Sequence, residues 1–166
     1  MAGVSVQAMT KRHSSARGGN VATNRSAGFR YELLDRFECG IVLVGSEVKS
    51  LRTGGAQLKD SYAVISDGEL WLHGVHIPPY APAARDNHDP ERPRKLLLHR
   101  YELERIAVRV KERGLTLVPT RIYFAGNRAK VEIALARGKA AHDKREAIRE
   151  REMRRDIERG LREARR

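Results

Sequence analysis

The last thirty residues of the chain contain too few apolar side chains to join a folded core. From Arg137 to Arg166 there are 12 Lys/Arg and 7 Asp/Glu, a net charge of about +5 with histidine neutral. The large apolar residues form a stripe one residue wide: Ile148, Met153, Ile157 and Leu161. Such a stripe is narrower than the face with which a helix packs firmly on a core. We therefore expect residues 138–166 to be a basic tail, mobile alone and helical when a partner supplies a surface.

The distribution of charge and the composition divide the chain into three parts. The whole chain of 166 residues carries +12, with a pI of about 10.4, which favours a polyanionic partner. Residues 1–27 are rich in Ser, Gly, Ala and Arg without periodicity, and we interpret them as a disordered basic arm. Residues 28–137 form the body, and its residues 31–136 hold 16 basic and 14 acidic side chains, so their charges nearly balance. Two alternatives are a basic protein that binds acidic surfaces loosely and a tail that lies on an anionic membrane, although the tail lacks Trp and Phe.

Short β-prone segments and two hairpin turns dominate the body. Asp67-Gly68 and Ala125-Gly126-Asn127 are the turn signals. The predicted strands are 37–44, 61–65, 70–76, 120–124 and 128–136. In the last of them Val131, Ile133 and Leu135 alternate with polar or small residues, which indicates a sheet with one solvent-exposed face.

Two helices are expected between the strands, over 46–53 and 99–113, each followed by glycine. Residues 78–93 hold five of the six prolines and are predicted to form a long exposed loop. Short strands with flanking helices in about 110 residues favour a mainly β, α+β fold, a small closed or partly open barrel of the OB type.

Three basic segments could contact RNA. On a helix over Gly45–Arg52, Lys49 and Arg52 share one face and could meet phosphates, with Ser50 as a further donor; the alternative is an ordinary surface helix. In Arg92–His99, three basic residues precede Leu96 to Leu98, whose burial would fix them; the alternative is a solvated loop. In the tail, His142 could stack on a base while its neighbours hold phosphates, or it could be a solvated histidine at a helix start capped by Asp143.

Catalytic patterns are weak in this sequence. The only cysteine, Cys39, lies in an apolar segment without a spaced histidine, so we expect no disulfide, no thiol nucleophile and a reducing, cytoplasmic location. No Cys/His spacing is typical of zinc, and no stretch is long and apolar enough to cross a membrane. His73 and His76 are expected on opposite faces of one strand. Acidic residues of the Pro-rich loop could hold a nuclease metal, although such loops are usually only solvated: Asp86, Asp89 and Glu91.

Several ordered motifs together resemble one family. They are the segment 45–52, Asp60-Ser61-Tyr62, His76-Ile77-Pro78, the segment 94–98, Lys130-Val131-Glu132, Gly138-Lys139 and Asp143-Lys144-Arg145. In this order and spacing, from about Asn24 to Arg155, the chain resembles the small protein B family of bacteria, the SsrA-binding proteins.

The resemblance implies a function without an enzyme activity, a cofactor or a metal. Proteins of this family bind the tRNA-like part of transfer-messenger RNA (tmRNA) and carry it to ribosomes stalled on messages that lack a stop codon. The nascent chain is then tagged for degradation, a process called trans-translation. The family fold is an OB-like barrel, and the tail enters the decoding centre and the empty message channel as a helix. We expect a monomer with two RNA partners, tmRNA and the ribosome.

The resemblance also implies site residues. Those of the body would contact tmRNA: Asn24, Arg25, Tyr31, Glu38, Lys49, Arg52, Lys95 and Leu97. Those of the tail would act in the ribosome: Gly138, Lys139, His142, Asp143, Lys144 and Arg145. Glu38 could accept hydrogen bonds from bases or ribose hydroxyls, or it could belong to an internal ion pair. Ala140 stands where the family often has a second lysine, so one phosphate contact is expected to be missing. The rival functions are a general RNA chaperone and a metal-dependent nuclease.

Overall fold

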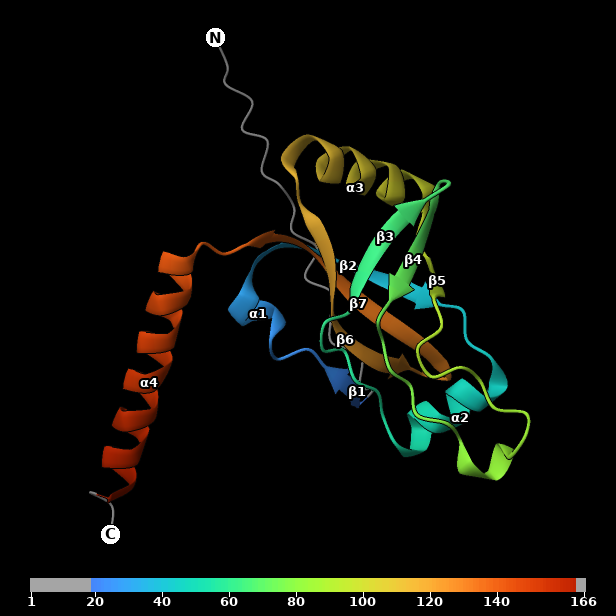
Figure 1. Cartoon of the computed structure of the whole chain (residues 1–166), viewed down its shortest axis with the longest axis horizontal. Coiled ribbons are helices and arrows are strands. Elements are labelled where there is room, and N and C mark those ends of the chain that lie inside the picture. The colour runs from blue at the N-terminus through green and yellow to red at the C-terminus, as the bar shows by residue number, and fades with distance from the viewer. Residues whose placement is uncertain (1–18, 164–166) are drawn as a thin grey trace.

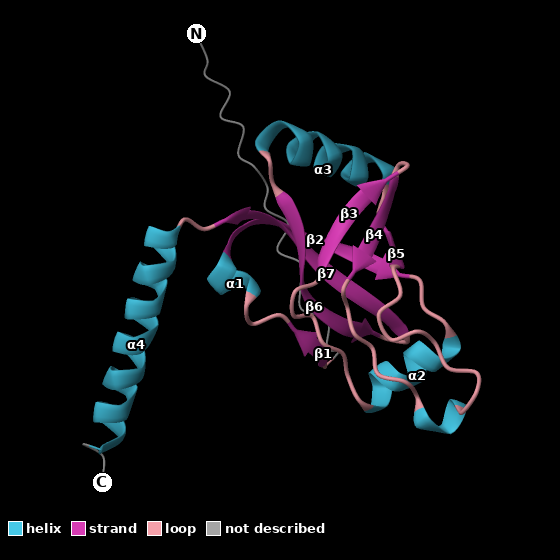
Figure 2. Ribbon diagram, viewed as in Figure 1, coloured by secondary structure: helices cyan, strands magenta, loops and turns pink. Residues whose placement is uncertain are grey.

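Seven antiparallel strands form the body of the protein, with α3 and α2 at its two ends and α1 and α4 at one side (Figures 1 and 2). The computed structural model describes residues 19–163, without the side chains at 112–113, 141–144 and 146–147. In chain order the elements are β1 (Asn20–Thr23), α1 (Ala27–Arg30), β2 (Tyr31–Ile41), α2 (Gly45–Thr53), β3 (Tyr62–Ser66), β4 (Glu69–His73), a 3-10 turn (Ala81–Ala83), β5 (Arg94–Leu97), α3 (Arg100–Arg113), β6 (Thr116–Ala125), β7 (Arg128–Gly138) and α4 (Ala141–Glu163).

The sheet closes on itself. The strand order is β1-β6-β3-β4-β5-β2-β7, and β6 also pairs with β7, so the strands from β6 round to β7 form a closed ring. Closure leaves few open strand edges. The expected OB-like barrel with flanking helices is confirmed, and its interior is filled by apolar side chains such as Leu72, Ile122 and Ile133, all fully buried.

The hairpin turns form where the sequence placed them. Asp67 and Gly68 join β3 to β4 with φ of 52° and 72°, the left-handed pair that a tight two-residue hairpin requires. Gly126, with φ of 60°, serves the β6–β7 turn. The predicted helices are also confirmed, and α3 ends at Gly114 in the left-handed region.

Strand bounds differ most from the predictions in three places, and in the first of them β6 begins at Thr116 rather than at residue 120. β2 begins earlier and ends earlier than the predicted 37–44. The strand predicted over 70–76 ends at His73, because Gly74 turns the chain with φ of 73° close to the backbone of Asp60 and Ser61. His76 instead forms an isolated bridge with Gln57, so His73 and His76 do not share a strand.

The outer face of β7 is only partly exposed to solvent. Val131, Ile133 and Leu135 face the core as predicted. On the other face Ala134 and Ala136 are also fully buried, and Ala136 packs in a small cluster with Ala27 of α1. The prediction of one wet face is therefore wrong for the second half of the strand, which α1 and its neighbours cover.

The folded body begins before Gly28. β1 pairs with β6, and the backbone N–H of Asn24 donates to the carbonyl of Thr120 at 2.8 Å. The predicted arm over 1–27 is therefore wrong for residues 20–27, whose strand is too short to show a period. Residues 1–18 lie outside the described part.

The Pro-rich loop is fixed on α2 rather than freely solvated. The side chain of Asn87 donates to the carbonyl of Tyr80 at 2.9 Å and accepts from its N–H at 2.8 Å. His88 contacts Ser46 at 2.9 Å and the carbonyl of Ile77 at 3.0 Å. These contacts join the two ends of the loop and attach it to the helix.

Helix α4 projects from the barrel beside α1 (Figure 1). The predicted helical tail is present, and its four large apolar side chains are exposed: Ile148, Met153, Ile157 and Leu161. Its main described contact with the body is the Arg151 guanidinium, 5.3 Å from the centroid of the Phe29 ring. That a partner orders this helix stays a prediction.

Candidate nucleic-acid interface

Helix α2 presents two of the predicted RNA contacts. Lys49 and Arg52 are exposed while Leu51 on the opposite face is buried, as the helical spacing predicted. The Lys49 ammonium lies 5.8 Å from the centroid of the Tyr80 ring, and the Arg52 guanidinium lies 5.1 Å from that of Phe124. Each cation thus makes a cation–π interaction with an aromatic ring, which restricts its position at the surface.

Ser50 is not available to a phosphate. Its side chain is buried, and its hydroxyl donates to the carbonyl of Pro78 at 2.5 Å. The predicted role of Ser50 as an RNA donor is wrong, because the hydroxyl instead holds the Pro-rich loop on α2.

A buried carboxylate attaches α2 to the segment before β5. Glu47 is fully buried, and its Oε1 accepts from Nε of Arg94 at 2.7 Å and from Nε of Arg92 at 2.9 Å. Its Oε2 accepts from the second nitrogen of Arg92 at 2.6 Å and from the backbone N–H of Val44 at 2.9 Å. Burial alone would raise the pKa of Glu47, but the hydrogen bonds from Arg92, Val44 and Arg94 hold this pKa below its ordinary value.

The basic segment before β5 is therefore not a cluster of three free cations. Arg94 is fully buried, and Arg92 is bound to the same carboxylate. Lys95 reaches the surface, where it pairs with Glu69. The expectation that the three leucines bury is also wrong for Leu97, which is 51% exposed while Leu96 is buried. A fully buried arginine has no signal in the sequence, because its partner Glu47 lies 47 residues away.

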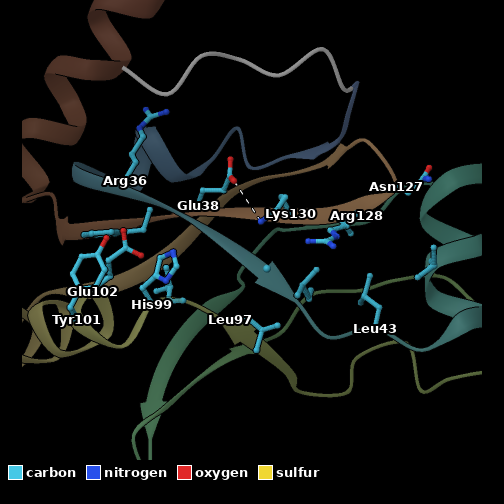
Figure 3. Close-up of a pocket in the computed structure, with 16 residues that line it drawn as sticks. Arg36, Glu38, Leu43, Leu97, His99, Tyr101, Glu102, Asn127, Arg128 and Lys130 are labelled. Carbon is cyan, nitrogen blue, oxygen red and sulfur yellow. Dashed lines mark ion pairs between the residues drawn. The ribbon is translucent and has the colours of Figure 1, made fainter. Parts of the chain in front are cut away.

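Two of the predicted body residues line a large cavity of about 880 Å³ (Figure 3). Glu38 comes from β2 and Leu97 from β5, and α2, α3 and the start of β7 also contribute to the walls. The polar residues on its walls include Arg36, Glu38, His99, Tyr101, Glu102, Arg128 and Lys130. The cavity thus combines cations, carboxylates, aromatic rings and an exposed leucine.

The carboxylate of Glu38 is held from two sides. Its Oε1 lies 3.7 Å from Nζ of Lys130, and its Oε2 accepts a hydrogen bond from the hydroxyl of Tyr123. Burial, and then the bond to Glu38, raises the pKa of Tyr123, so the phenol stays a donor. The internal ion pair considered for Glu38 is therefore present, yet the side chain remains 38% exposed and can accept further bonds. The alternation along β7 placed Lys130 outward, but nothing in the sequence indicated Tyr123.

Asn24 and Tyr31 line a second, smaller hollow of about 250 Å³ beside α1. The amide of Asn24 is already used inside the fold, since it donates to the carbonyl of Pro119 at 3.0 Å and accepts from Ser26 at 2.8 Å. Tyr31 packs on the cluster around Ala136, and Arg25 is exposed. The structure thus divides the predicted body residues among the large cavity, this hollow, α2 and β5, with Arg25 in the turn between β1 and α1.

The base of the tail is fixed to α1. Gly138 ends β7 opposite Tyr31. Lys139 donates its backbone N–H to Arg30 at 3.1 Å and its ammonium to the carbonyl of Gly28 at 3.0 Å. Lys139 is therefore an anchor of the tail in this structure.

Helix α4 begins at Ala141, so Asp143 lies in its first turn and the prediction that it caps a helix from Lys144 is wrong. The side chains of His142, Asp143 and Lys144 lie outside the described part, and Arg145 is exposed.

Other features offer little chemistry. Cys39 is fully buried, and burial above all raises the pKa of its thiol to about 12, so it is a poor nucleophile at neutral pH. Among the residues that the structure describes, no group of three or more His, Cys, Asp or Glu is placed to hold a metal. Within the same residues, no helix is long and apolar enough to span a membrane.

Comparison with known proteins assigns the chain to a family. The model of the SmpB protein family matches residues 21–163, which include every strand of the barrel except the first residue of β1, and helix α4. The chain belongs to the SmpB family.

Curated relatives in the SmpB family align with the sequence of this chain over nearly their whole length. An SsrA-binding protein of Sulfurihydrogenibium sp. is 55% identical over 85% of this chain and 93% of its own. Another, from Roseiflexus sp., is 55% identical over 89% of this chain and 97% of its own. A chain from the solved structure "tmRNA-SmpB: a journey to the center of the bacterial ribosome" superposes with a TM-score of 0.64 at 48% identity, covering 77% of this chain and 94% of that one.

Proposed function

We propose that this protein binds the tRNA-like part of tmRNA and delivers it to stalled ribosomes for trans-translation. Membership of the SmpB family supports the RNA partner, and the 48% identity to a chain solved as tmRNA-SmpB supports the ribosomal setting. The observation that carries the proposal is the large cavity, where Glu38 and Leu97, two residues expected to contact tmRNA, lie together. Translation takes place in the cytoplasm, and we place the site of action there.

The chemistry of the cavity suits folded RNA. Glu38, held by Tyr123 and Lys130, offers free lone pairs to base N–H groups or ribose hydroxyls, and hydroxyl contacts distinguish RNA from DNA. Lys49 and Arg52 on α2 supply phosphate contacts, which orient the RNA without reading its sequence. The body therefore recognises an RNA shape through a few fixed polar groups.

The tail has a separate role in this proposal. Helix α4 contains 23 residues, about 35 Å at 1.5 Å per residue, a length suited to a message path. Gly138, Lys139, His142, Asp143, Lys144 and Arg145 would act in the decoding region, with the ring of His142 stacking on a base.

Shortening Leu97 tests the body site. We expect Leu97→Ala to weaken binding of the tRNA-like domain about ten-fold, because it removes apolar contact worth roughly 0.8 kcal/mol per methylene and 1.4 kcal/mol is ten-fold in affinity. Val108 on α3 is equally exposed, at 51%, and does not line the cavity, so Val108→Ala is the matched control and should bind within about two-fold of the wild type. Equal affinity of the two variants in a filter-binding titration would contradict the assignment of the cavity.

A further inference from the structure

Two of the aromatic side chains that line the large cavity, His99 and Tyr101, form an offset stack. The centroids of His99 and Tyr101 are 5.7 Å apart and their planes differ by 15° (Figure 3). Both side chains are exposed, and 61% of Tyr101 is accessible to solvent. An exposed stacked pair has an open ring face, and stacking on an open face is how proteins hold unpaired bases.

The local backbone explains why these two rings meet. Residues two apart within a helix do not face each other. His99, however, precedes α3 in an extended conformation, and its carbonyl accepts from the N–H groups of Glu102 and Leu103, both at 3.1 Å. Tyr101 lies in the first turn. The helix start therefore sets the position of both side chains before any ligand binds.

The rest of the cavity matches the charged part of a nucleotide. Three cationic side chains line the cavity, Arg36, Arg128 and Lys130, and so do the carboxylates of Glu38 and Glu102. Arg36 and Lys130 already have carboxylate partners, whereas Arg128 is exposed and forms no ion pair with any carboxylate in the part of the chain that the structure describes. The volume of about 880 Å³ lies within the range of roughly 300–1,000 Å³ that is usual for small-ligand sites, enough for a nucleotide.

We propose that this cavity holds one unpaired nucleotide of the bound RNA, with its base stacked on the His99–Tyr101 pair and its phosphate near Arg128. The inference rests on the proposed function and deepens it, because it assigns an extruded base to the cavity where Glu38 and Leu97 lie. Stacking on an aromatic ring tolerates any base, so the site selects an unpaired position in a folded RNA rather than a sequence.

The test uses the tRNA-like domain of tmRNA with the fluorescent base 2-aminopurine placed at one unpaired position at a time. Stacking quenches this base. We expect the full-length protein to quench one position strongly, and Tyr101→Ala to abolish that quenching and weaken binding about ten-fold. Tyr101→Phe keeps the ring and should restore both the quenching and the affinity to within about two-fold.

A neighbouring cation provides the matched control. Arg100 lies between the two aromatic residues in the chain, its side chain is 92% exposed, and it pairs with Glu104. Arg100→Ala should leave the quenching unchanged, because it removes charge and not a ring.

A decrease in the thermal stability of Tyr101→Ala that accounts for its weaker binding would overturn the proposal.

The outcomes separate the two proposals. If the wild type binds the tRNA-like domain tightly but no position is quenched, or if the quenching survives Tyr101→Ala, the nucleotide site is wrong and the proposed function stands. If the wild type binds the tRNA-like domain no better than an unrelated hairpin, the proposed function itself is wrong.

Discussion

Replacing Glu47 by glutamine should lower the free energy of unfolding by about 3–5 kcal/mol, the usual effect of breaking a buried ion pair by removing one partner. Glu47 and Arg94 are both fully buried. Glutamine retains one acceptor oxygen, and its amide group would face arginine donors that now have no acceptor. The midpoint of thermal unfolding should fall by on the order of 10 °C in calorimetry.

Glu104→Gln is the matched control. Glu104 lies on the exposed face of α3 and pairs with Arg100 at 3.3 Å, with side chains that are 69% and 92% exposed. An exposed pair one helical turn apart is worth only about 0.3–0.5 kcal/mol. A similar loss of stability in both variants would contradict the structural role of Glu47.

The same substitution should change the acid unfolding of the protein. The folded-state pKa of Glu47 lies below its ordinary value of 4.5, so Glu47 stabilises the fold above about pH 4.5 and this contribution is lost as the pH falls through the lowered pKa. Glu47→Gln removes this contribution, so its stability should change less over that acid range than that of the wild type. Urea unfolding at several pH values measures the difference.

Removing residues 141–166 should abolish tagging of nascent chains while changing affinity for the tRNA-like domain by less than about three-fold. The described contacts of α4 with the body are few, whereas the body residues that we propose for RNA binding lie before Gly138. The truncation keeps Gly138 and Lys139, because Lys139 anchors the end of β7 to α1.

The matched control for this truncation retains residues 141–166 in shuffled order, which preserves their charge but not the apolar stripe. It should bind the RNA as well as the wild type and also fail to tag. Tagging that persists in an in vitro translation assay without α4 would contradict the separate roles of body and tail.

The fold could largely be predicted because its signals are local. The alternation of Val131, Ile133 and Leu135 and the Asp67-Gly68 turn depend on a few neighbouring residues. β1 was missed because a strand of four residues carries no readable period, and its position depends on pairing with β6, about 100 residues later.

The site was predicted less completely because its geometry depends on distant pairs. Arg94 and Lys95 are adjacent basic residues, yet Arg94 is fully buried in an ion pair with Glu47, whereas Lys95 pairs with Glu69 at the surface. The hydroxyl of Ser50 donates its hydrogen bond to the carbonyl of Pro78 and not to a ligand. Tyr123 reaches Glu38 across 85 residues of sequence. Sequence patterns predicted which strands carry polar groups, but only the closed barrel shows which of those groups meet.

Competition binding distinguishes recognition of a particular RNA shape from non-specific binding to phosphates. Labelled tRNA-like domain bound to the full-length protein is challenged with a large excess of an unrelated RNA hairpin at physiological salt, which must be fixed because phosphate contacts alone vary steeply with salt. We expect the complex to survive, since Glu38, Leu97 and the fixed cations recognise a particular RNA shape. Displacement by the hairpin at about equal concentration would show a non-specific basic protein and contradict the proposed role in trans-translation.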